Sequence, residues 1–126
     1  MEEPNIKTWV KSQTIPNGVH NGEIIMTEPR VYGEYKYLDI VVKFTELENN
    51  PELKYGVPNT DNISENSKLG RLLIALGIKF EENTDIDVNK ILIGKKISFQ
   101  VLNKPSKKDP MKIYANIVED SISLQN

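Results

Sequence analysis

The stretch SENSKLGRLLIALG, residues 64–77, decides how the rest of the chain can fold. Its leucines recur at the spacing i, i+3, i+4 and i+7, which places four of them on one face of an α-helix: Leu69, Leu72, Leu73 and Leu76. Ser64 is suited to cap the start of this helix, and Gly77 is suited to end it in a left-handed conformation. Gly70 inside the helix costs about 1 kcal/mol relative to alanine. A close approach of the helix to a sheet would explain that glycine.

Segments on both sides of the helix alternate apolar and polar residues with a period of two, which indicates β-strands with one buried face. Three precede the helix, at 21–28, 34–44 and 52–58, and two follow it, at 95–103 and 111–119. The residues expected to face the core are Leu38, Ile40, Val42, Phe44, Leu53, Tyr55, Val57, Ile97, Phe99, Val101, Met111, Ile113, Ala115 and Ile117. No second segment has helical spacing, and the acids of 81–87 are expected to cap a short helical turn or to stay solvated.

This element order predicts a mainly β fold, a five-stranded OB-fold barrel with one helix between strands 3 and 4. We expect an N-terminal arm over residues 1–18 and the OB-fold domain over residues 19–126. Trp9 is expected to pin the arm to the barrel, because a single tryptophan near a terminus usually packs. Phe80 is expected in the core, together with the two phenylalanines of the strands, and His20 is expected on the surface.

Several motifs resemble phage- and archaeal-type OB-fold proteins of the single-stranded-DNA-binding kind. They are the helix SENSKLGRLLIALGI (64–78), the acidic spacer after it, and ILIGKKISFQVL (91–102), in which Gly94 and Lys95 open a strand. The opening WVKSQTIPNGVHNGEI (9–24) is similar to the arm and first strand of such proteins. The resemblance covers most of the chain, although the tail VEDSISLQN differs from the long acidic tail of many replication-type members. It implies an OB-fold, binding of single-stranded DNA, and a role in viral or archaeal DNA replication, repair or recombination.

Positive charge is concentrated in one part of a chain whose formal net charge is −2. Residues 90–112 contain seven lysines and one acid, Asp109, and four of these lysines belong to NKPSKKDPMK (103–112), which we call the basic segment. In an OB-fold this segment is the loop between strands 4 and 5, beside the ligand groove. Its lysines can contact phosphates, while its two prolines limit the entropy lost on binding. The alternative is a lysine-rich hairpin that serves solubility alone.

Aromatic and basic residues also alternate in EPRVYGEYKY (28–37), the predicted connection between strands 1 and 2. Tyrosine rings on the outer face can stack on bases while cations hold the backbone; the alternative is cross-strand packing of these rings. Tyr114 is a third stacking candidate, beside Lys112. The candidate nucleic-acid-binding residues are therefore Arg30, Tyr32, Tyr35, Lys36, Tyr37, Lys43, Lys104, Lys107, Lys108, Lys112 and Tyr114.

Several classes of function are disfavoured by composition. The chain has no cysteine and one histidine, which excludes disulfides and the usual zinc sites. We find no Ser/His/Asp set, phosphate-binding glycine loop or calcium loop, so we expect neither an enzyme nor a cofactor. The polar, acidic start is unlike a secretory signal, and no apolar run approaches the ~20 residues of a membrane span. These features predict a cytoplasmic protein without a membrane partner.

The sequence thus predicts a domain that binds single-stranded nucleic acid with little sequence preference, DNA being favoured over RNA. Assembly into a homo-oligomer would strengthen binding through avidity. The alternative is an OB-fold protein-interaction or assembly module without nucleic-acid binding, in which surface charges set the orientation of a partner.

Overall fold

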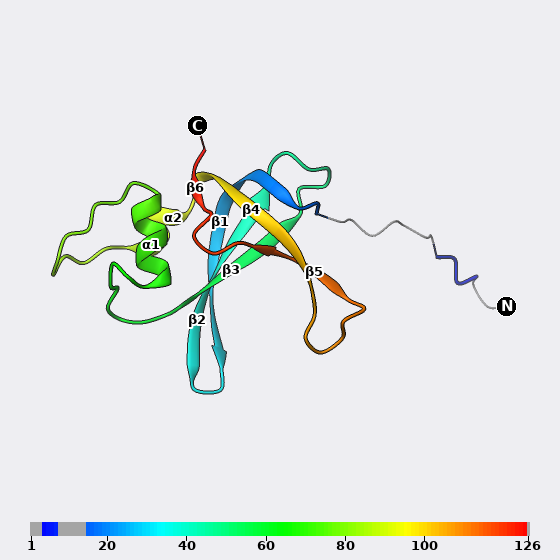
Figure 1. The fold of residues 1–126 in the computed structure, drawn as a ribbon, viewed down its shortest axis with the longest axis horizontal. Coiled ribbons are helices and arrows are strands. Elements are labelled where there is room, and N and C mark those ends of the chain that lie inside the picture. The colour runs from blue at the N-terminus through cyan, green and yellow to red at the C-terminus, as the bar shows by residue number, and fades with distance from the viewer. Residues whose placement is uncertain (1–3, 8–14, 126) are drawn as a thin grey trace.

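The computed structural model describes residues 4–7 and 15–125, and Trp9 lies outside the described residues. Over these described residues the fold is mainly β, as predicted, with a six-stranded antiparallel sheet and two short helices (Figure 1). The strands are β1 (Gly18–Tyr32), β2 (Tyr35–Phe44), β3 (Glu52–Pro58), β4 (Lys96–Pro105), β5 (Ile113–Ile117) and β6 (Ser123–Leu124). Their order is β3-β2-β1-β4-β5, and the short β6, which the sequence did not predict, pairs with β4. The end strands of this order, β3 and β5, contact each other, and no register pairs them among the described residues.

The predicted helix is α1 (Lys68–Ala75), which buries Leu69, Leu72 and Leu73. Its N-cap is Ser67, whose Oγ accepts a hydrogen bond from the Gly70 amide at 3.0 Å, so the assignment of Ser64 as the cap was wrong. Ser64 instead accepts hydrogen bonds through its carbonyl oxygen, from the Ser67 amide at 3.0 Å and the Ser67 hydroxyl at 2.6 Å. Gly77 follows the helix with φ +88°, which confirms the predicted left-handed ending.

Gly70 is explained by a close approach of backbone to backbone, and the predicted approach to the sheet was wrong. A Cβ atom on Gly70 would lie 2.0 Å from the carbonyl oxygen of Ser64. The turn that precedes α1 folds back against the first turn of the helix, and only glycine leaves room for it.

A second helix, α2 (Val88–Leu92), contradicts the prediction of a single helix. With five residues it is too short to show a helical period in the sequence. The Asp87 carboxylate caps it by accepting from the Lys90 amide at 3.2 Å, which confirms that an acid of this segment caps a short helical turn. Asn89 accepts a hydrogen bond from the Thr27 hydroxyl at 2.5 Å, which joins α2 to β1.

The predicted core faces of β2, β3 and β4 are confirmed. Their buried residues are Leu38, Ile40, Val42, Phe44, Tyr55, Val57, Ile97, Phe99 and Val101, with Leu53 packed against them. The face predicted for the last strand is only partly correct, because β5 begins at Ile113. Met111 precedes the strand and is 90% exposed, and Ile113 is also exposed, since both lie where the β4–β5 hairpin extends past the core.

Two single-residue predictions were also wrong. Phe80 is exposed because it lies in the connection between α1 and α2 and not on a face of either helix. His20 is buried within β1, where its ring meets Phe44 edge-on at 5.3 Å between centroids. The imidazole Nε2 donates a hydrogen bond to the Pro16 carbonyl oxygen at 2.7 Å, so the buried ring is satisfied.

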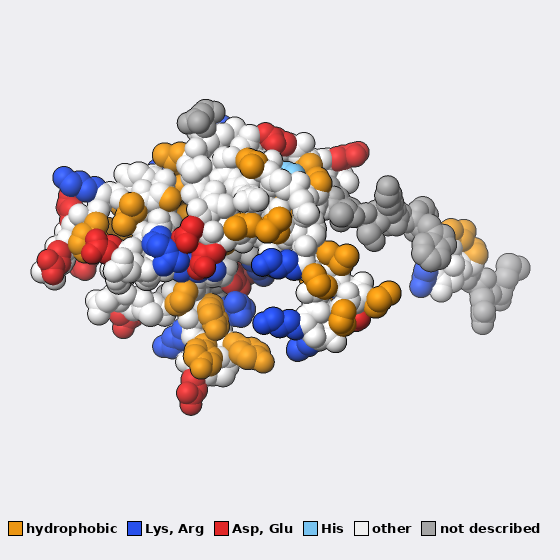
Figure 2. All heavy atoms as spheres, viewed as in Figure 1, with side chains coloured by type: hydrophobic (Ala, Val, Ile, Leu, Met, Phe, Trp, Pro, Cys, Tyr) orange, Lys and Arg blue, Asp and Glu red, His pale blue; other side chains and the backbone are white. Residues whose placement is uncertain are grey.

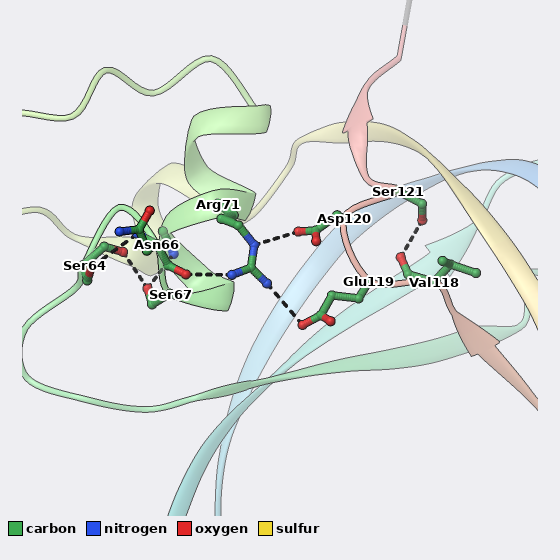
Figure 3. A network of polar contacts seen from close by, with 9 residues as sticks. Ser64, Asn66, Ser67, Arg71, Val118, Glu119, Asp120 and Ser121 are labelled. Carbon is green, nitrogen blue, oxygen red and sulfur yellow. Dashed lines mark hydrogen bonds and ion pairs between the residues drawn. The ribbon is translucent and has the colours of Figure 1, made fainter.

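Polar contacts fix the helix and the N-terminal segment to the sheet. Arg71 of α1 donates from Nε to Asp120 at 2.9 Å and from Nη2 to Glu119 at 3.2 Å, in the segment after β5 (Figure 3). The hydrogen bond to Asp120 raises the pKa of Arg71 above its ordinary value. At the other end, the Asn103 side chain donates to the Ile15 carbonyl oxygen at 2.8 Å, and Ile15 itself is buried in the core.

Within the described ranges, no helix has the length and apolar character that crossing a bilayer requires.

Candidate nucleic-acid interface

The β1–β2 hairpin carries most of the predicted aromatic residues. Its turn consists of Gly33 and Glu34, between the paired residues Tyr32 and Tyr35. Gly33 has φ +62° at the first central position, which is typical of the type II′ turn that suits two-residue hairpins. The prediction of a connection between strands over 28–37 was therefore wrong, because these residues belong to two paired strands joined by a two-residue turn.

A β-bulge in β1 determines which side chains share the outer face of this hairpin. The register with β2 shifts between Ile24 and Met26, so Ile24 faces the core while Met26 pairs with Val41 on the opposite face. An extra residue in one strand reverses the alternation beyond it. As a result Arg30 and Tyr32 lie on the same outer face as their partners in β2.

The tyrosines form a partly exposed aromatic surface towards the tip of the hairpin. Tyr32 and Tyr35 are 73% and 66% exposed. The rings of Tyr35 and Tyr37 lie 6.5 Å apart between centroids and are tilted by 36°. Rings exposed to this degree on neighbouring positions can accept planar groups by stacking.

Arg30 is held by its neighbours and does not extend into solvent as an isolated cation. Its Nε and Nη2 atoms donate to the two carboxylate oxygens of Asp39, at 2.8 Å and 3.3 Å. Its guanidinium carbon lies 4.6 Å from the centroid of the Tyr37 ring. The hydrogen bond to Asp39 raises the pKa of Arg30 further above its ordinary value. Asp39 lies on the outer face, as predicted, but it is buried there.

The basic segment forms the far end of the β4–β5 hairpin. Lys104 belongs to β4, where it pairs with Tyr114, so its placement in a loop was wrong. The loop proper spans 106–112 and has internal hydrogen bonds, from the Ser106 amide to the Lys112 carbonyl at 2.8 Å and from the Met111 amide to the Asp109 carboxylate at 3.1 Å. Its only acid is thus engaged with the backbone of the loop.

An open groove separates the two hairpins. Both project from the same side of the sheet, and the space-filling view shows Lys and Arg side chains and hydrophobic side chains around the hollow between them (Figures 1 and 2). On the β4–β5 side a hollow of ≈ 610 Å³ is lined by Leu102, Lys104, Pro105, Ser106, Tyr114, Asn116, Ile117, Val118 and Glu119. The exposed Lys107, Lys108 and Lys112 follow in the loop beyond it.

The remaining two lysines predicted for the interface differ in their surroundings. Lys36 is exposed in β2, one residue from Tyr35 and Tyr37. Lys43 lies at the other end of β2, between Glu23 of β1 and Glu52 of β3 in the sheet register. Two flanking carboxylates weaken the attraction of Lys43 for a phosphate. The structure therefore brings the tyrosines and Arg30 together on one face of the hairpin. It places Lys36, which pairs with Val31, on the opposite face of the same hairpin, and Lys43 at the far end of β2.

Sequence reasoning missed the acids that organise this face. Asp39 fixes Arg30, and Glu28 accepts a hydrogen bond from Lys54 at 3.1 Å across the outer side of the sheet. The one available signal was Asp39 itself, an acid within an otherwise apolar run of β2. Across the described parts of the chain, no group of three or more His, Cys, Asp or Glu side chains could hold a metal ion.

No protein-family model matches the chain, and a search of curated proteins finds no significant match to it.

Proposed function

We propose that the chain is an OB-fold barrel that binds single-stranded nucleic acid, DNA in preference to RNA, with little sequence preference. The strand order β3-β2-β1-β4-β5, the contact between β3 and β5, and α1 between β3 and β4 support the barrel. In such a barrel, the outer face and the two hairpin loops that flank it are the surfaces that take oligonucleotides.

The observation that carries the proposal is the groove with tyrosines on one hairpin and lysines on the other. Stacking on Tyr32 and Tyr35 is independent of base identity, because every base has a π-face. The exposed lysines of the basic segment on the second hairpin supply charge for the phosphates, and Lys36 adds charge from the other face of the first hairpin. The internal hydrogen bonds of the 106–112 loop reduce the ordering that binding requires.

A second candidate is a protein-docking module, which one observation favours. Met111 and Ile113, beside the lysines of the basic segment, are 90% and 66% exposed. Such apolar side chains at a hairpin tip suit a protein partner, and charge around them would then affect the rate of association. A protein of this class has no appreciable affinity for an oligonucleotide, so titration with labelled oligo-dT at low salt separates the two candidates.

Replacing Lys107 and Lys108 together by serine is expected to reduce the magnitude of the salt slope for oligo-dT binding by about 1.4. Each phosphate contact on a single strand contributes about 0.7 to the fall of log K with log[salt]. The slope is measured by fluorescence anisotropy at several salt concentrations. Both lysines are exposed in the loop, so the free energy of unfolding should change by less than about 0.5 kcal/mol per residue.

The matched control replaces Lys79 and Lys90 by serine, which removes the same charge from the α1–α2 connection and α2, far from the basic segment (Figure 1). The control should keep the wild-type slope. Equal slopes for both double variants and the wild type would show that the basic segment does not contact phosphates.

Tyr35→Ala is expected to weaken oligo-dT binding by about 5- to 150-fold without changing the salt slope, because stacking on one ring contributes about 1–3 kcal/mol per base. Tyr35→Phe keeps the ring and should bind like the wild type. Since Tyr35 is exposed, neither change should alter the thermal unfolding temperature appreciably. Wild-type affinity in Tyr35→Ala would exclude this ring as a stacking site.

A further inference from the structure

Among the candidate interface cations, Arg30 is the one that forms an ion pair with another described residue. Both of its contacts to Asp39 are hydrogen bonds, and the Asp39 side chain is only 7% exposed while that of Arg30 is 48% exposed. A phosphate approaching Arg30 therefore meets a buried carboxylate directly behind the guanidinium, which offsets most of the attraction. Arg30 differs in this respect from Lys36 and the lysines of the basic segment, for which no acid lies within salt-bridge distance among the described residues.

The same contacts fix the orientation of the guanidinium plane. A two-point hydrogen bond to a carboxylate lies in that plane, so Asp39 sets its direction. The Tyr37 ring, 4.6 Å from the guanidinium carbon, covers one side of Arg30. With Tyr37 and Asp39 in place, the Arg30 side chain is still 48% exposed. Three of its five N–H donors also remain, because Asp39 uses only two.

A glycine in the neighbouring strand β3 leaves room for the Arg30–Asp39 pair. Gly56 of β3 pairs with Asp39 in the sheet register. A Cβ atom there would lie 3.1 Å from Asp39 Oδ1 and 3.5 Å from Arg30 Nη2. A side chain at position 56 would crowd the carboxylate, so the glycine keeps room beside the pair for both groups.

We propose that Arg30 binds a nucleobase on the face of its guanidinium away from Tyr37, as a stacking platform supported by that ring. Asp39 is the positioning residue that holds the guanidinium plane in a fixed orientation. The inference rests on the proposed function. It states that Arg30 contacts the bases of the nucleic acid, whereas its charge alone would suggest contact with the phosphate backbone. Arginine planes stack on unpaired bases as aromatic rings do. The platform continues the tyrosine surface of the hairpin tip toward the centre of the sheet.

Arg30→Lys tests the platform, because it keeps the charge and removes the plane. Two probes are titrated by fluorescence anisotropy: labelled oligo-dT, and an oligomer of equal length with abasic residues throughout, which keeps the phosphates and lacks the bases. We expect Arg30→Lys to bind oligo-dT about 5- to 100-fold more weakly than the wild type, at an unchanged salt slope. Its affinity for the abasic oligomer should equal that of the wild type.

Asp39→Asn tests the positioning role with a readout that general loss of structure would not produce. Without the carboxylate, Arg30 loses its fixed plane and its counter-charge together. Binding of oligo-dT should weaken, while the salt slope for the abasic oligomer should become steeper by about 0.7, as a released arginine contacts a phosphate. Circular dichroism and thermal unfolding of each variant verify that it is folded.

The possible results distinguish the stacking role of Arg30 from the proposed binding of single-stranded nucleic acid. Suppose that the wild type binds oligo-dT. If Arg30→Lys then binds it equally well, or loses the same affinity for oligo-dT and for the abasic oligomer, Arg30 is not a stacking platform, and the proposed function still holds. Failure of the wild type to bind oligo-dT overturns both. An unchanged abasic slope in a folded Asp39→Asn protein overturns the positioning role of the carboxylate.

Discussion

Phe99→Ala is expected to lower the free energy of unfolding by about 3–5 kcal/mol, as large aromatic truncations in a packed core do. The Phe99 ring is 1% exposed and meets Phe44 edge-on, with 5.2 Å between centroids and 81° between planes. Its removal takes away apolar burial and leaves a cavity between β4 and β2. Urea denaturation followed by circular dichroism measures the change.

Phe80→Ala is the matched control, because the same chemical change falls on a ring that is 48% exposed. We expect its cost to stay below about 1 kcal/mol. A loss at Phe80 as large as that at Phe99 would mean that the α1–α2 connection packs into the core, and the placement of this connection would then be incorrect.

Gly70→Ala is expected to destabilise the protein by about 1–3 kcal/mol, although alanine is the better helix former by about 1 kcal/mol. The added methyl group would lie 2.0 Å from the Ser64 carbonyl oxygen, which also accepts two hydrogen bonds from Ser67. The turn before α1 must therefore open, and the N-cap moves with it. Helix propensity alone would predict that Gly70→Ala raises the free energy of unfolding, whereas we expect a decrease. Thermal or urea unfolding distinguishes the two.

Higher stability of Gly70→Ala would show that the segment around Ser64 does not fold back on α1. Ser67→Ala provides an independent check on the same turn. Loss of this N-cap should cost about 0.5–2 kcal/mol, whereas the assignment of Ser64 as the cap would leave Ser67→Ala nearly neutral.

The sequence predicted best where one periodic pattern runs through a whole element. Alternation in β2 and β4 identified the residues of the core face, and the leucine spacing identified α1. It failed where the period changes within an element. The bulge near Ile25 reverses the faces of β1, so a strand of 15 residues appeared in the sequence as a short strand followed by a connection.

The residue types of the candidate site could be predicted from the sequence, but the pairing of these residues in space could not. Tyrosines and lysines were expected near one another, and they do lie on the two hairpins that flank the groove. The pairing of Arg30 with Asp39 depends on a register in which Arg30 lies beside Tyr37, and register follows from the bulge and the turn together. No local pattern could have shown that pairing. The same holds for Lys43, whose flanking glutamates come from two other strands.

Titration against single-stranded and double-stranded DNA tests whether the two hairpins bind single strands. The wild-type protein is titrated into labelled oligo-dT, and into a duplex of the same length, at salt concentrations from low to moderate. We expect the protein to bind the single strand with log K falling linearly with log[salt], by about 0.7 for each phosphate contacted. The duplex should bind more weakly, because its stacked bases cannot reach the tyrosines. Absence of binding to oligo-dT at low salt would exclude single-stranded nucleic acid as the ligand, and an affinity for it that does not vary with salt would exclude phosphate contacts by the lysines.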